Sequence, residues 1–386
     1  MSVSRLQHLC GIGVNEVGDR ADALNDPEML RLENLDTDLP PPPAAIEVTR
    51  RAVDDDAANS YLPLEGHREL RESAATHVSR ISGTTYDPIG ECVSVAGGLN
   101  GVLNTLLAVV EPGQEVVITD RVYAGLLNRI RLAGAIPRPV AARPTKAGWV
   151  IDPGELAAAV GPQTAAILLM GPVMPTGAVL SPQHFEALAE PASRHRAWVI
   201  YDAAMERIRF DGQPPLHPAS HPALAERTIT IGSASKELRM IGWRVGWVVG
   251  PRSILHDIAL VGLTNVVCQV GIAQQAVAAA LSDPHADNDI AAATNTWRQR
   301  CDLIIERLAH YPVVRPHGGW SLLIDTTALG LTPEQASTRI FEHGRVAATP
   351  MTGWGPSGER YLRLVFANEP VQRLTDLRSR FDAAFA

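Results

Sequence analysis

The chain has 386 residues, of which 46% are hydrophobic and 20% charged, and its formal net charge is −8. This length predicts two domains and a large buried core, and the composition is typical of a globular protein and excludes a disordered one. Because nucleic acids and anionic membranes attract a concentrated basic face, the acidic balance excludes both as the main partner.

The cysteines and the hydropathy pattern bear on where the protein works. The four cysteines are widely spaced, without a C-x-x-C pair: Cys10, Cys92, Cys268 and Cys301. This spacing favours free thiols in a reducing compartment over a disulfide framework or a zinc site. No run of about 18 apolar residues occurs, and the first residues lack a signal-peptide pattern. We therefore expect a cytoplasmic protein that is not bound to a membrane.

Residues 1–44 are predicted to form an irregular N-terminal arm that joins a smaller domain. The arm ends in LPPPPAA, where four consecutive prolines forbid a regular helix or a central strand. Within the arm, the stretch LENLDTDL (32–39) is expected to border the functional site. Hydrophobic and charged positions then recur at helical spacing, which predicts helices over residues 44–54 and 67–79.

From about residue 91 onward, short apolar runs alternate with helical patterns. The runs are apolar at consecutive positions, which is typical of strands buried on both faces and hence of a mostly parallel sheet flanked by helices. They lie at residues 91–97, 115–120, 136–142, 165–171, 197–202, 227–232 and 243–250. We expect a large α/β domain over residues 45–270. Helical patterns followed by mixed strands and helices over 271–386 predict an interdomain helix and a smaller α+β domain.

The residues that follow these strands are where chemistry is expected, because open α/β sheets bind ligands at the carboxyl ends of their strands. One strand is followed by GGLNG (97–101), where glycines let the backbone approach a phosphate and a helix start offers free N–H groups. Another is followed by GPVMPTG (171–177), and a third ends in the carboxylate of Asp202. The fourth leads into SASKELRMIGWRVGW (233–247), which contains Lys236.

Lys236 stands out because only two of the 34 lysine and arginine residues are lysines, the other being Lys146. A lysine amine can lose its proton when it is partly buried, and it can then form a Schiff base with an aldehyde cofactor. A guanidinium stays charged and cannot do this. A Schiff-base lysine is also the only interpretation that gives a use to all four strand exits.

Three other site chemistries fit the residues less well. A dinucleotide site would use GGLNG (97–101) and Asp120, but the glycines do not form G-x-G-x-x-G and Lys236 would be idle. A serine acylase would use the S-x-x-K of Ser233 and Lys236, but neither K-T-G nor S-D-N occurs. A metal site lacks HExxH, and His217 and His221 lie among prolines, so we expect both at the surface.

The segment SASK (233–236) followed by Gly242-x-Arg244-x-Gly246 resembles the cofactor-attachment motif of the class I/II aminotransferases, which are pyridoxal-phosphate enzymes of fold type I. The resemblance extends through nearly the whole chain. YLPLEGHRELR (61–71) is similar to the family's stretch in which a tyrosine reaches across a dimer interface. The resemblance implies the fold-type-I α/β architecture and a homodimer in which Tyr61 reaches the partner's site.

The same resemblance implies roles for individual residues around pyridoxal 5'-phosphate. Lys236 would carry the cofactor as a Schiff base and move a proton at the substrate's Cα. Tyr123 would stack on the pyridine ring, Asp202 would face the ring nitrogen, and Arg363 would grip the α-carboxylate of an amino acid. Donors for the cofactor phosphate would come from Gly97, Gly98, Leu99, Ser233, Ser235 and Arg244.

Two positions depart from the family's pattern. The family usually has Asn-Pro-Thr-Gly and Asp-x-x-Tyr, where the Asn and the Tyr donate hydrogen bonds to the cofactor's phenolic oxygen, whereas this chain has Met174 and Met205. A thioether donates no hydrogen bond. In one interpretation, neighbouring groups or water supply the missing donors and transamination proceeds. In the other, the phenolic oxygen holds the imine proton more tightly, which favours decarboxylation, elimination or reaction with oxygen.

The sequence therefore predicts a pyridoxal-phosphate-dependent enzyme that acts on an α-amino acid, with an aminotransferase as the leading function. A lyase, decarboxylase or oxidative deaminase of specialised metabolism is the alternative. A catalytically silent cofactor-binding regulator is the rival of another class, but it would normally carry a DNA-binding appendage, and no helix-turn-helix or basic segment is evident. The substrate side chain and the amino acceptor stay open.

Overall fold

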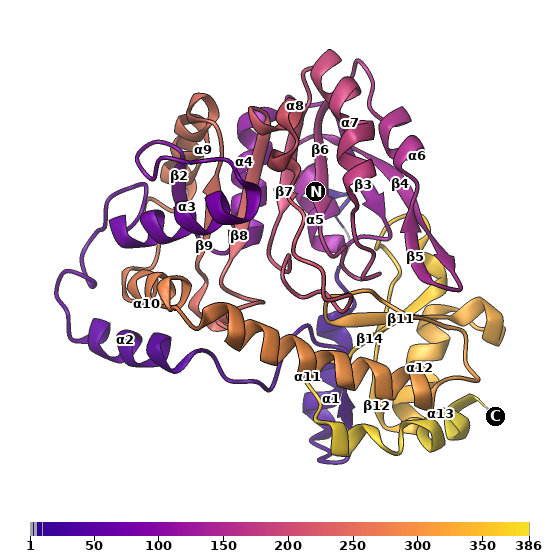
Figure 1. Ribbon diagram of the computed structural model, residues 1–386. Helices are drawn as coiled ribbons and strands as arrows, with labels where there is room; N and C mark the ends of the chain where they lie inside the picture. Colours follow the sequence, from indigo (N-terminus) through magenta and orange to yellow (C-terminus); the bar gives the residue numbers. More distant parts are fainter. Residues whose placement is uncertain (1–2, 4–5, 10, 386) are drawn as a thin grey trace.

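The computed structural model describes residues 3, 6–9 and 11–385, and an eight-stranded sheet forms the centre of its larger part (Figure 1). The strand order is β2-β9-β8-β7-β6-β3-β4-β5. In chain order the strands are β2 (Cys92–Val95), β3 (Glu115–Asp120), β4 (Ile136–Thr145), β5 (Gly148–Ile151), β6 (Thr164–Met170), β7 (Trp198–Asp202), β8 (Thr228–Ser233) and β9 (Gly246–Val249).

The middle of this sheet is parallel. Strands β8, β7, β6, β3 and β4 pair in parallel, whereas β9, β2 and β5 add antiparallel pairings toward the edges. Strands β2, β6 and β8 are buried at almost every position, as strands of consecutive apolar residues must be. The predicted fold class is confirmed, and each of the seven apolar runs contains a strand. Strand β5, which pairs with β4, was not predicted.

Helices flank the large sheet, and two of them lie close to their predicted bounds. The helix expected over 44–54 is α2 (Pro43–Val53), which has proline in its first turn, and the one expected over 67–79 is α3 (Arg68–Ser82). Helix α3 ends at Gly83, whose φ of 74° is readily adopted by glycine. The others are α4 (Gly98–Val109), α5 (Ala124–Leu132), α6 (Pro153–Ala158), α7 (Pro182–Arg194), α8 (Pro222–Ala225), α9 (Arg252–Asn265) and α10 (Gly271–Ser282).

The smaller part is built on an antiparallel sheet with strand order β10-β11-β14-β13. Helix α11 (Ala286–Arg307) runs from beneath the large sheet to this sheet (Figure 1). The remaining elements are β10 (Val313–Val314), β11 (Ser321–Asp325), α12 (Pro333–Gly344), β12 (Val346–Ala347), β13 (Thr349–Pro350), β14 (Tyr361–Val365) and α13 (Leu377–Phe385). Short 3-10 helices lie at 218–220, 241–243, 326–329, 358–360 and 371–374. The domain limits at residues 44 and 270 stay predictions.

The N-terminal arm is not irregular, contrary to the expectation from the sequence. It contains helix α1 (Val14–Leu24) and strand β1 (Leu30–Arg31), which pairs in parallel with β12 of the smaller part. Val17 and Ala21 are the buried residues of α1, and they belong to a small apolar cluster with Phe341 of α12. The expectation rests on the prolines at 40–43, which lie beyond α1 and β1 and therefore do not constrain the residues before them.

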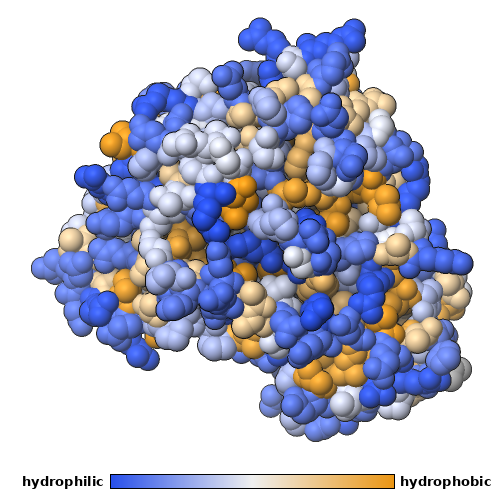
Figure 2. Space-filling model, viewed as in Figure 1, coloured by the Kyte–Doolittle hydropathy of each residue, from blue (hydrophilic) through white to orange (hydrophobic). Residues whose placement is uncertain are grey.

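Three larger apolar clusters form the core of the molecule. One surrounds the large sheet and includes Met174, another surrounds the small sheet and includes Met205, and the third packs α3 and α10 against β2 and β9. Hydrophilic residues cover most of the face drawn in Figure 2, with apolar residues in small groups between them. Side chains from the first two clusters line one cavity, so this cavity lies where these two cores meet.

Candidate active site

A cavity of about 270 Å³ lies at the carboxyl ends of β6, β7 and β8, whose last residues are Met170, Asp202 and Ser233. Open α/β sheets bind their ligands at this position. Eleven of the residues predicted from the sequence line the cavity: Gly98, Leu99, Tyr123, Met174, Asp202, Met205, Ser233, Ser235, Lys236, Arg244 and Arg363. The fold thus gathers side chains from distant parts of the chain into one site.

Lys236 lies in the turn after β8, and its amine is held from two directions. The Nζ atom donates a hydrogen bond to the carbonyl oxygen of Leu35 at 2.9 Å, and it lies 4.8 Å from the centre of the Trp320 ring. Burial lowers the pKa of Lys236 to about 7, a shift that the carboxylate of Asp36 opposes and the guanidinium of Arg363 reinforces. A large fraction of this amine is therefore neutral at neutral pH, as a nucleophilic lysine requires.

Asp202 ends strand β7 and places a carboxylate in the cavity. Its Oδ1 accepts a hydrogen bond from the N–H of Ala204 at 3.1 Å. Burial raises the pKa of Asp202 to about 6, although the Ala204 hydrogen bond and the positive charge of Lys236 both lower it. The group is mostly ionised at neutral pH, so the cavity offers an anion that suits a protonated ring nitrogen.

Glycines at the start of helix α4 let neighbouring groups approach the backbone closely. Gly97 has a φ of 81°, and a Cβ atom there would lie 2.5 Å from Nη2 of Arg244. A Cβ atom on Gly98 would lie 3.2 Å from that of Ser233. The N–H groups of Gly98 and Leu99 belong to the first turn, where a helix provides no partner for them. Free amides at a helix N-terminus bind phosphate well.

Hydroxyl and guanidinium groups continue this anion-binding surface. Nη1 of Arg244 donates to Oγ of Ser235 at 3.2 Å and to the carbonyl oxygen of Ile241 at 2.9 Å. Oγ of Ser233 accepts from the N–H of Ser235 at 3.2 Å, so its own proton can be donated elsewhere. These three side chains and the α4 amides make a cradle dense in donors.

Arg363 is fully buried on strand β14, with part of its guanidinium unpaired. Its Nη2 donates to the carbonyl oxygen of Glu33 and to Oγ1 of Thr349, and its Cζ lies 4.8 Å from the centre of the Trp354 ring. Among the described residues, its Nε and Nη1 atoms have no hydrogen-bond partner. Burial lowers the pKa of Arg363 to about 10, so the group stays charged at neutral pH. A buried cation with two free donors fits a carboxylate.

The cavity lining also includes an aromatic side chain and side chains that contain sulfur, among them Tyr123, Met174 and Met205. The Tyr123 ring lies edge-on to the Trp354 ring, with 5.4 Å between the ring centres. The backbone N–H of Tyr123 donates to the carbonyl oxygen of Met174 at 3.1 Å. Met174 and Met205 are both almost fully buried, with exposed fractions of 4% and 2%. Both line the cavity, so the departures from the family's pattern lie inside the site.

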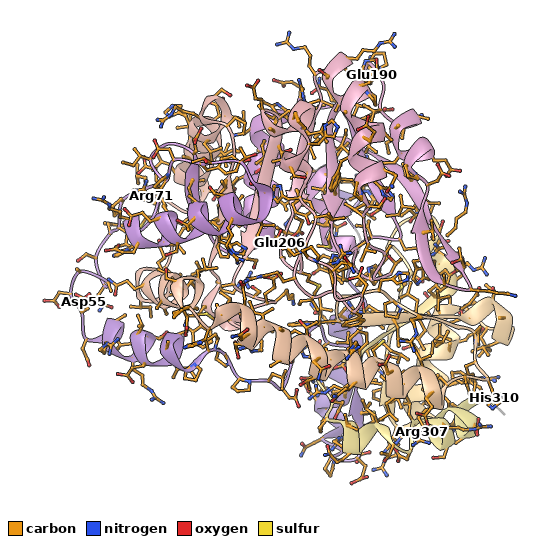
Figure 3. The ribbon with its side chains drawn as sticks, in the orientation of Figure 1. Asp55, Arg71, Glu190, Glu206, Arg307 and His310 are labelled. Atoms are coloured by element: carbon orange, nitrogen blue, oxygen red, sulfur yellow. The ribbon has the colours of Figure 1, made fainter. Side chains whose placement is uncertain are left out.

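Two predicted residues do not line the cavity. Gly97 lies just behind it, against Arg244. Tyr61 is 88% exposed, in the segment between α2 and α3. Figure 3 labels Asp55 near the start of this segment and Arg71 on α3 beyond its end, and the segment runs along the outer edge of the molecule. Within one chain, therefore, Tyr61 does not belong to the site.

Several lining residues had no assigned role in the sequence. Asn34 and Leu35 belong to the stretch that was expected to border the site, and the structure places both on the cavity. The others are Ile12, Val14, Asn15, Met170, Ala204 and Ile241. Residues 12–15 reach the cavity because the arm packs against β13. This packing is close at Gly13, where an added Cβ atom would lie 3.4 Å from the carbonyl oxygen of Pro350. No sequence pattern signals such a contact.

The expectation that His217 lies at the surface is wrong. Only 1% of this residue is exposed, because its ring packs inward, edge-on to the ring of Tyr201. Each histidine of the HPASHP stretch precedes the first residue of a short helix. The Nδ1 atom of His217 accepts from the N–H of Ala219 at 3.1 Å, its Nε2 lies 3.0 Å from Oγ1 of Thr230, and burial lowers its pKa to about 3. His221 is partly exposed, with Nε2 3.1 Å from a carboxylate oxygen of Glu186.

Two negative findings apply to the part of the chain that the structure describes. It holds no group of three or more His, Cys, Asp or Glu side chains that could bind a metal ion. Over the same residues, no helix has both the length and the apolar character needed to span a membrane.

Comparisons with known proteins agree with this geometry. Residues 28–381 match the family model of aminotransferase class I and II. The chain is 32% identical over 351 residues to an arginine–pyruvate transaminase of Pseudomonas aeruginosa, covering 89% of this chain and 87% of that protein. It is 30% identical over 356 residues to an aspartate/prephenate aminotransferase of Thermus thermophilus, covering 92% and 91%.

A solved structure extends the likeness to the fold. The N-succinyldiaminopimelate aminotransferase from Mycobacterium tuberculosis superposes with a TM-score of 0.92, at 29% identity and with all of both chains covered. A match through nearly the whole sequence, the shared fold and a cavity at the expected strand ends lead to one conclusion. The chain belongs to the class I and II aminotransferases.

Proposed function

We propose that this cavity holds pyridoxal 5'-phosphate on Lys236 and that the enzyme moves the amino group of an α-amino acid to an oxo acid. The cofactor supplies an aldehyde that condenses with amines and a ring that withdraws electrons from the substrate's Cα. The observation that carries the proposal is the convergence, in one cavity, of a nucleophilic amine, a donor-rich cradle, a carboxylate and a guanidinium with free donors.

The residues of the cavity fit each part of the cofactor. The phosphate needs several donors, which the first turn of α4, Ser233, Ser235 and Arg244 can supply. The crowding of a Cβ atom at Gly97 supports the need for glycine beside that phosphate. Asp202, ionised at neutral pH, would hold the proton on the ring nitrogen.

Two side chains would act on the substrate. Arg363 would bind the α-carboxylate through an N–H group that has no partner among the described residues of the chain, and this contact fixes the orientation of the Cα bonds. Lys236, displaced by the substrate amine, would take the proton from the substrate's Cα and deliver it to the former aldehyde carbon of the cofactor. Its pKa of about 7 suits both steps, because the amine accepts and releases protons readily near neutral pH.

Assembly and location are part of the same proposal. The exposure of Tyr61 supports a homodimer in which this tyrosine completes the partner's cofactor site. Cys92, Cys268 and Cys301 are free thiols in the structure, which supports a reducing, cytoplasmic environment.

The direct test is covalent. Purified holoenzyme is expected to be yellow, and borohydride reduction followed by proteolysis and mass spectrometry is expected to place the cofactor on Lys236. The matched control is Lys146, the chain's other lysine, which is exposed in the turn between β4 and β5. Lys146→Ala should be labelled like the wild type, whereas Lys236→Ala should not be labelled. Stoichiometric label on Lys236→Ala would overturn the assignment.

A second candidate function rests on one observation, the two thioethers beside Asp202. Met174 and Met205 donate no hydrogen bonds to the cofactor's phenolic oxygen, so that oxygen would hold the imine proton more strongly. This electronic change favours loss of carbon dioxide, loss of a side-chain fragment or reaction with oxygen over amino transfer. Incubation with amino-acid mixtures, followed by mass spectrometry, separates the candidates by whether nitrogen is transferred, released or retained.

The two methionines also make a spectroscopic prediction. The Schiff base of Lys236 should stay protonated to higher pH than in Met174→Asn/Met205→Tyr, because that variant restores both donors. With a net ~1 kcal/mol for each hydrogen bond, the variant's transition should lie roughly one to two pH units lower. The measurement is the absorbance of the bound cofactor during a pH titration, and the same transition in both proteins would contradict the prediction.

A further inference from the structure

We propose that the substrate's side chain is uncharged and apolar, an aliphatic or thioether chain rather than an acidic or basic one. This inference rests on the proposed function, because it takes the positions of the substrate amine and carboxylate from it. The side chain would occupy the part of the cavity that the cofactor, the amine and the carboxylate leave over.

Each cation of the cavity already has a partner in the proposed function. Among the described lining residues the cationic side chains are Lys236, Arg244 and Arg363. Lys236 bonds with the cofactor aldehyde, and Arg244 belongs to the phosphate cradle with Ser235. The unpaired donors of Arg363 are assigned to the α-carboxylate, and its Nη2 is held by Glu33 and Thr349. Among the described lining residues of the same chain, no cation is left for a second carboxylate.

The arm segment 33–35 sets where the substrate lies. The carbonyl oxygen of Glu33 accepts from Arg363, and the carbonyl oxygen of Leu35 accepts from Lys236 at 2.9 Å. The carboxylate clamp and the amine therefore lie at the two ends of one short stretch of backbone. A substrate held by both must pass along this stretch, with its side chain directed to the remaining walls.

Those remaining walls are mostly apolar. The lining residues to which no contact with the cofactor or the amino-acid core is assigned are Ile12, Val14, Asn15, Asn34, Leu35, Met170, Ala204 and Ile241. Residues 12–15 lie against β13, next to Thr349, which accepts a hydrogen bond from Arg363. The apolar side chains of the arm thus close the cavity on the side of the carboxylate clamp.

This wall discriminates between side chains by charge. An apolar side chain is removed from water against Ile12, Val14 and Leu35, which favours binding. A carboxylate or a second ammonium would be desolvated there without an opposite charge. The amides of Asn15 and Asn34 can form hydrogen bonds with a substrate but cannot neutralise it.

The names of the relatives do not decide this point. One is named for arginine and pyruvate, another for aspartate and prephenate, and a third for N-succinyldiaminopimelate. These names cover basic, acidic and acylated substrates at about the same level of identity. The wall of the cavity is therefore the better guide for this chain.

The test is a single-turnover measurement on the holoenzyme. Leucine, methionine, aspartate, glutamate, arginine and lysine are each mixed with it, and the loss of Schiff-base absorbance gives a rate and a half-saturating concentration. We expect leucine or methionine to exceed every charged amino acid by at least about 100-fold in the ratio of rate to half-saturating concentration. A charged amino acid within threefold of leucine, or faster than leucine, overturns the inference.

A charge introduced into the wall sharpens the test. Val14→Arg places a cation in the cavity, and it should raise the aspartate-to-leucine ratio by about 10- to 100-fold. Leu24→Arg, on the last turn of the same helix and 55% exposed, is the matched control and should leave the ratio unchanged. The same ratio in Val14→Arg as in the wild type would show that this wall does not meet the side chain.

Failure of the inference and failure of the proposed function look different. If the holoenzyme reacts with aspartate or lysine and not with leucine, the proposed function stands and the apolar wall is refuted. If borohydride fixes no cofactor to Lys236, or if none of the amino acids changes the absorbance, the proposed function itself fails and this inference falls with it.

Discussion

Two ionisable side chains meet near the centre of the molecule, where Figure 3 labels Glu206. Nε2 of His77 on α3 lies 3.1 Å from Oε1 of Glu206, and both residues are buried. Burial raises the pKa of Glu206 to about 7, although the guanidinium groups of Arg207 and Arg80 lower it. Burial also lowers the pKa of His77 to about 3. His77 is therefore neutral near pH 7, and the contact is a hydrogen bond rather than an ion pair.

Glu206 should make stability depend on pH. Its pKa is raised from an ordinary value of 4.5, so its contribution to the free energy of unfolding is full below about pH 4.5 and is lost as the pH rises through about 7. The side chain of Glu206→Gln does not titrate. From pH 5 to pH 8, the free energy of unfolding of this variant should therefore rise relative to that of the wild type by on the order of 3 kcal/mol. Urea unfolding at both pH values measures this gain.

The control for this measurement is Glu190→Gln. The Glu190 side chain is 74% exposed on α7, and Figure 3 labels it at the edge of the molecule. Its substitution should change the free energy of unfolding by less than about 1 kcal/mol at either pH, because exposed ion pairs contribute little. Equal effects of Glu206→Gln at pH 5 and pH 8 would contradict the burial argument.

At the scale of elements, helix α1 connects the packing of the smaller part to the wall of the cavity. The helix begins at Val14, which lines the cavity, and it is anchored by Val17 and Ala21 against Phe341 and Ala347. The anchor is small, so α1 is expected to be less stable than the central sheet. Loosening the anchor should affect substrate binding more than the chemical step.

Val17→Ala should weaken this anchor by about 1–3 kcal/mol, because it removes buried methyl groups. The KM for the amino acid should rise several-fold with little change in kcat, and the α1 amides should exchange faster with deuterium. Leu24→Ala, at an exposed position of the same helix, should change neither quantity. A fall in kcat with an unchanged KM would show instead that α1 acts on the chemistry.

The elements differ in how far the sequence predicts them. Strands β6, β7 and β8 were predictable because burial on both faces requires consecutive apolar residues. Asp202 and Lys236 could be predicted as site residues because each follows such a strand and carries chemistry that a core position would not need. The contribution of Ile12, Val14 and Asn15 could not be predicted, because it depends on the arm folding back onto β13.

At the scale of the whole molecule, the outer edge that carries Tyr61 exposes several large apolar side chains among polar ones. Val53, Tyr61 and Leu64 are exposed around one segment, and Val267 and Val270 are exposed just before α10. The two segments touch, since a Cβ atom on Gly271 would meet the carbonyl oxygen of Ala58. Large apolar side chains exposed on neighbouring segments favour a protein–protein interface. This surface supports the proposed homodimer.

Complementation between inactive variants tests the dimer. Tyr61→Ala and Lys236→Ala should each have little activity alone, because every site in those homodimers lacks one residue. In a mixed dimer, one site combines Lys236 of one subunit with Tyr61 of its partner, so mixing should recover up to about one quarter of wild-type activity when exchange is random. No recovery under conditions where the subunits exchange would contradict a site shared in this way.

The scarcity of lysine has a practical consequence for experiments on this enzyme. The chain has one lysine inside the cavity and one, Lys146, exposed at the turn between β4 and β5. Lys236 is shielded by burial, so Lys146 is the side-chain amine open to acylating reagents in the native protein. A fluorophore or a surface linker attached through it would report from one defined corner of the large sheet, and each molecule would be immobilised in the same orientation.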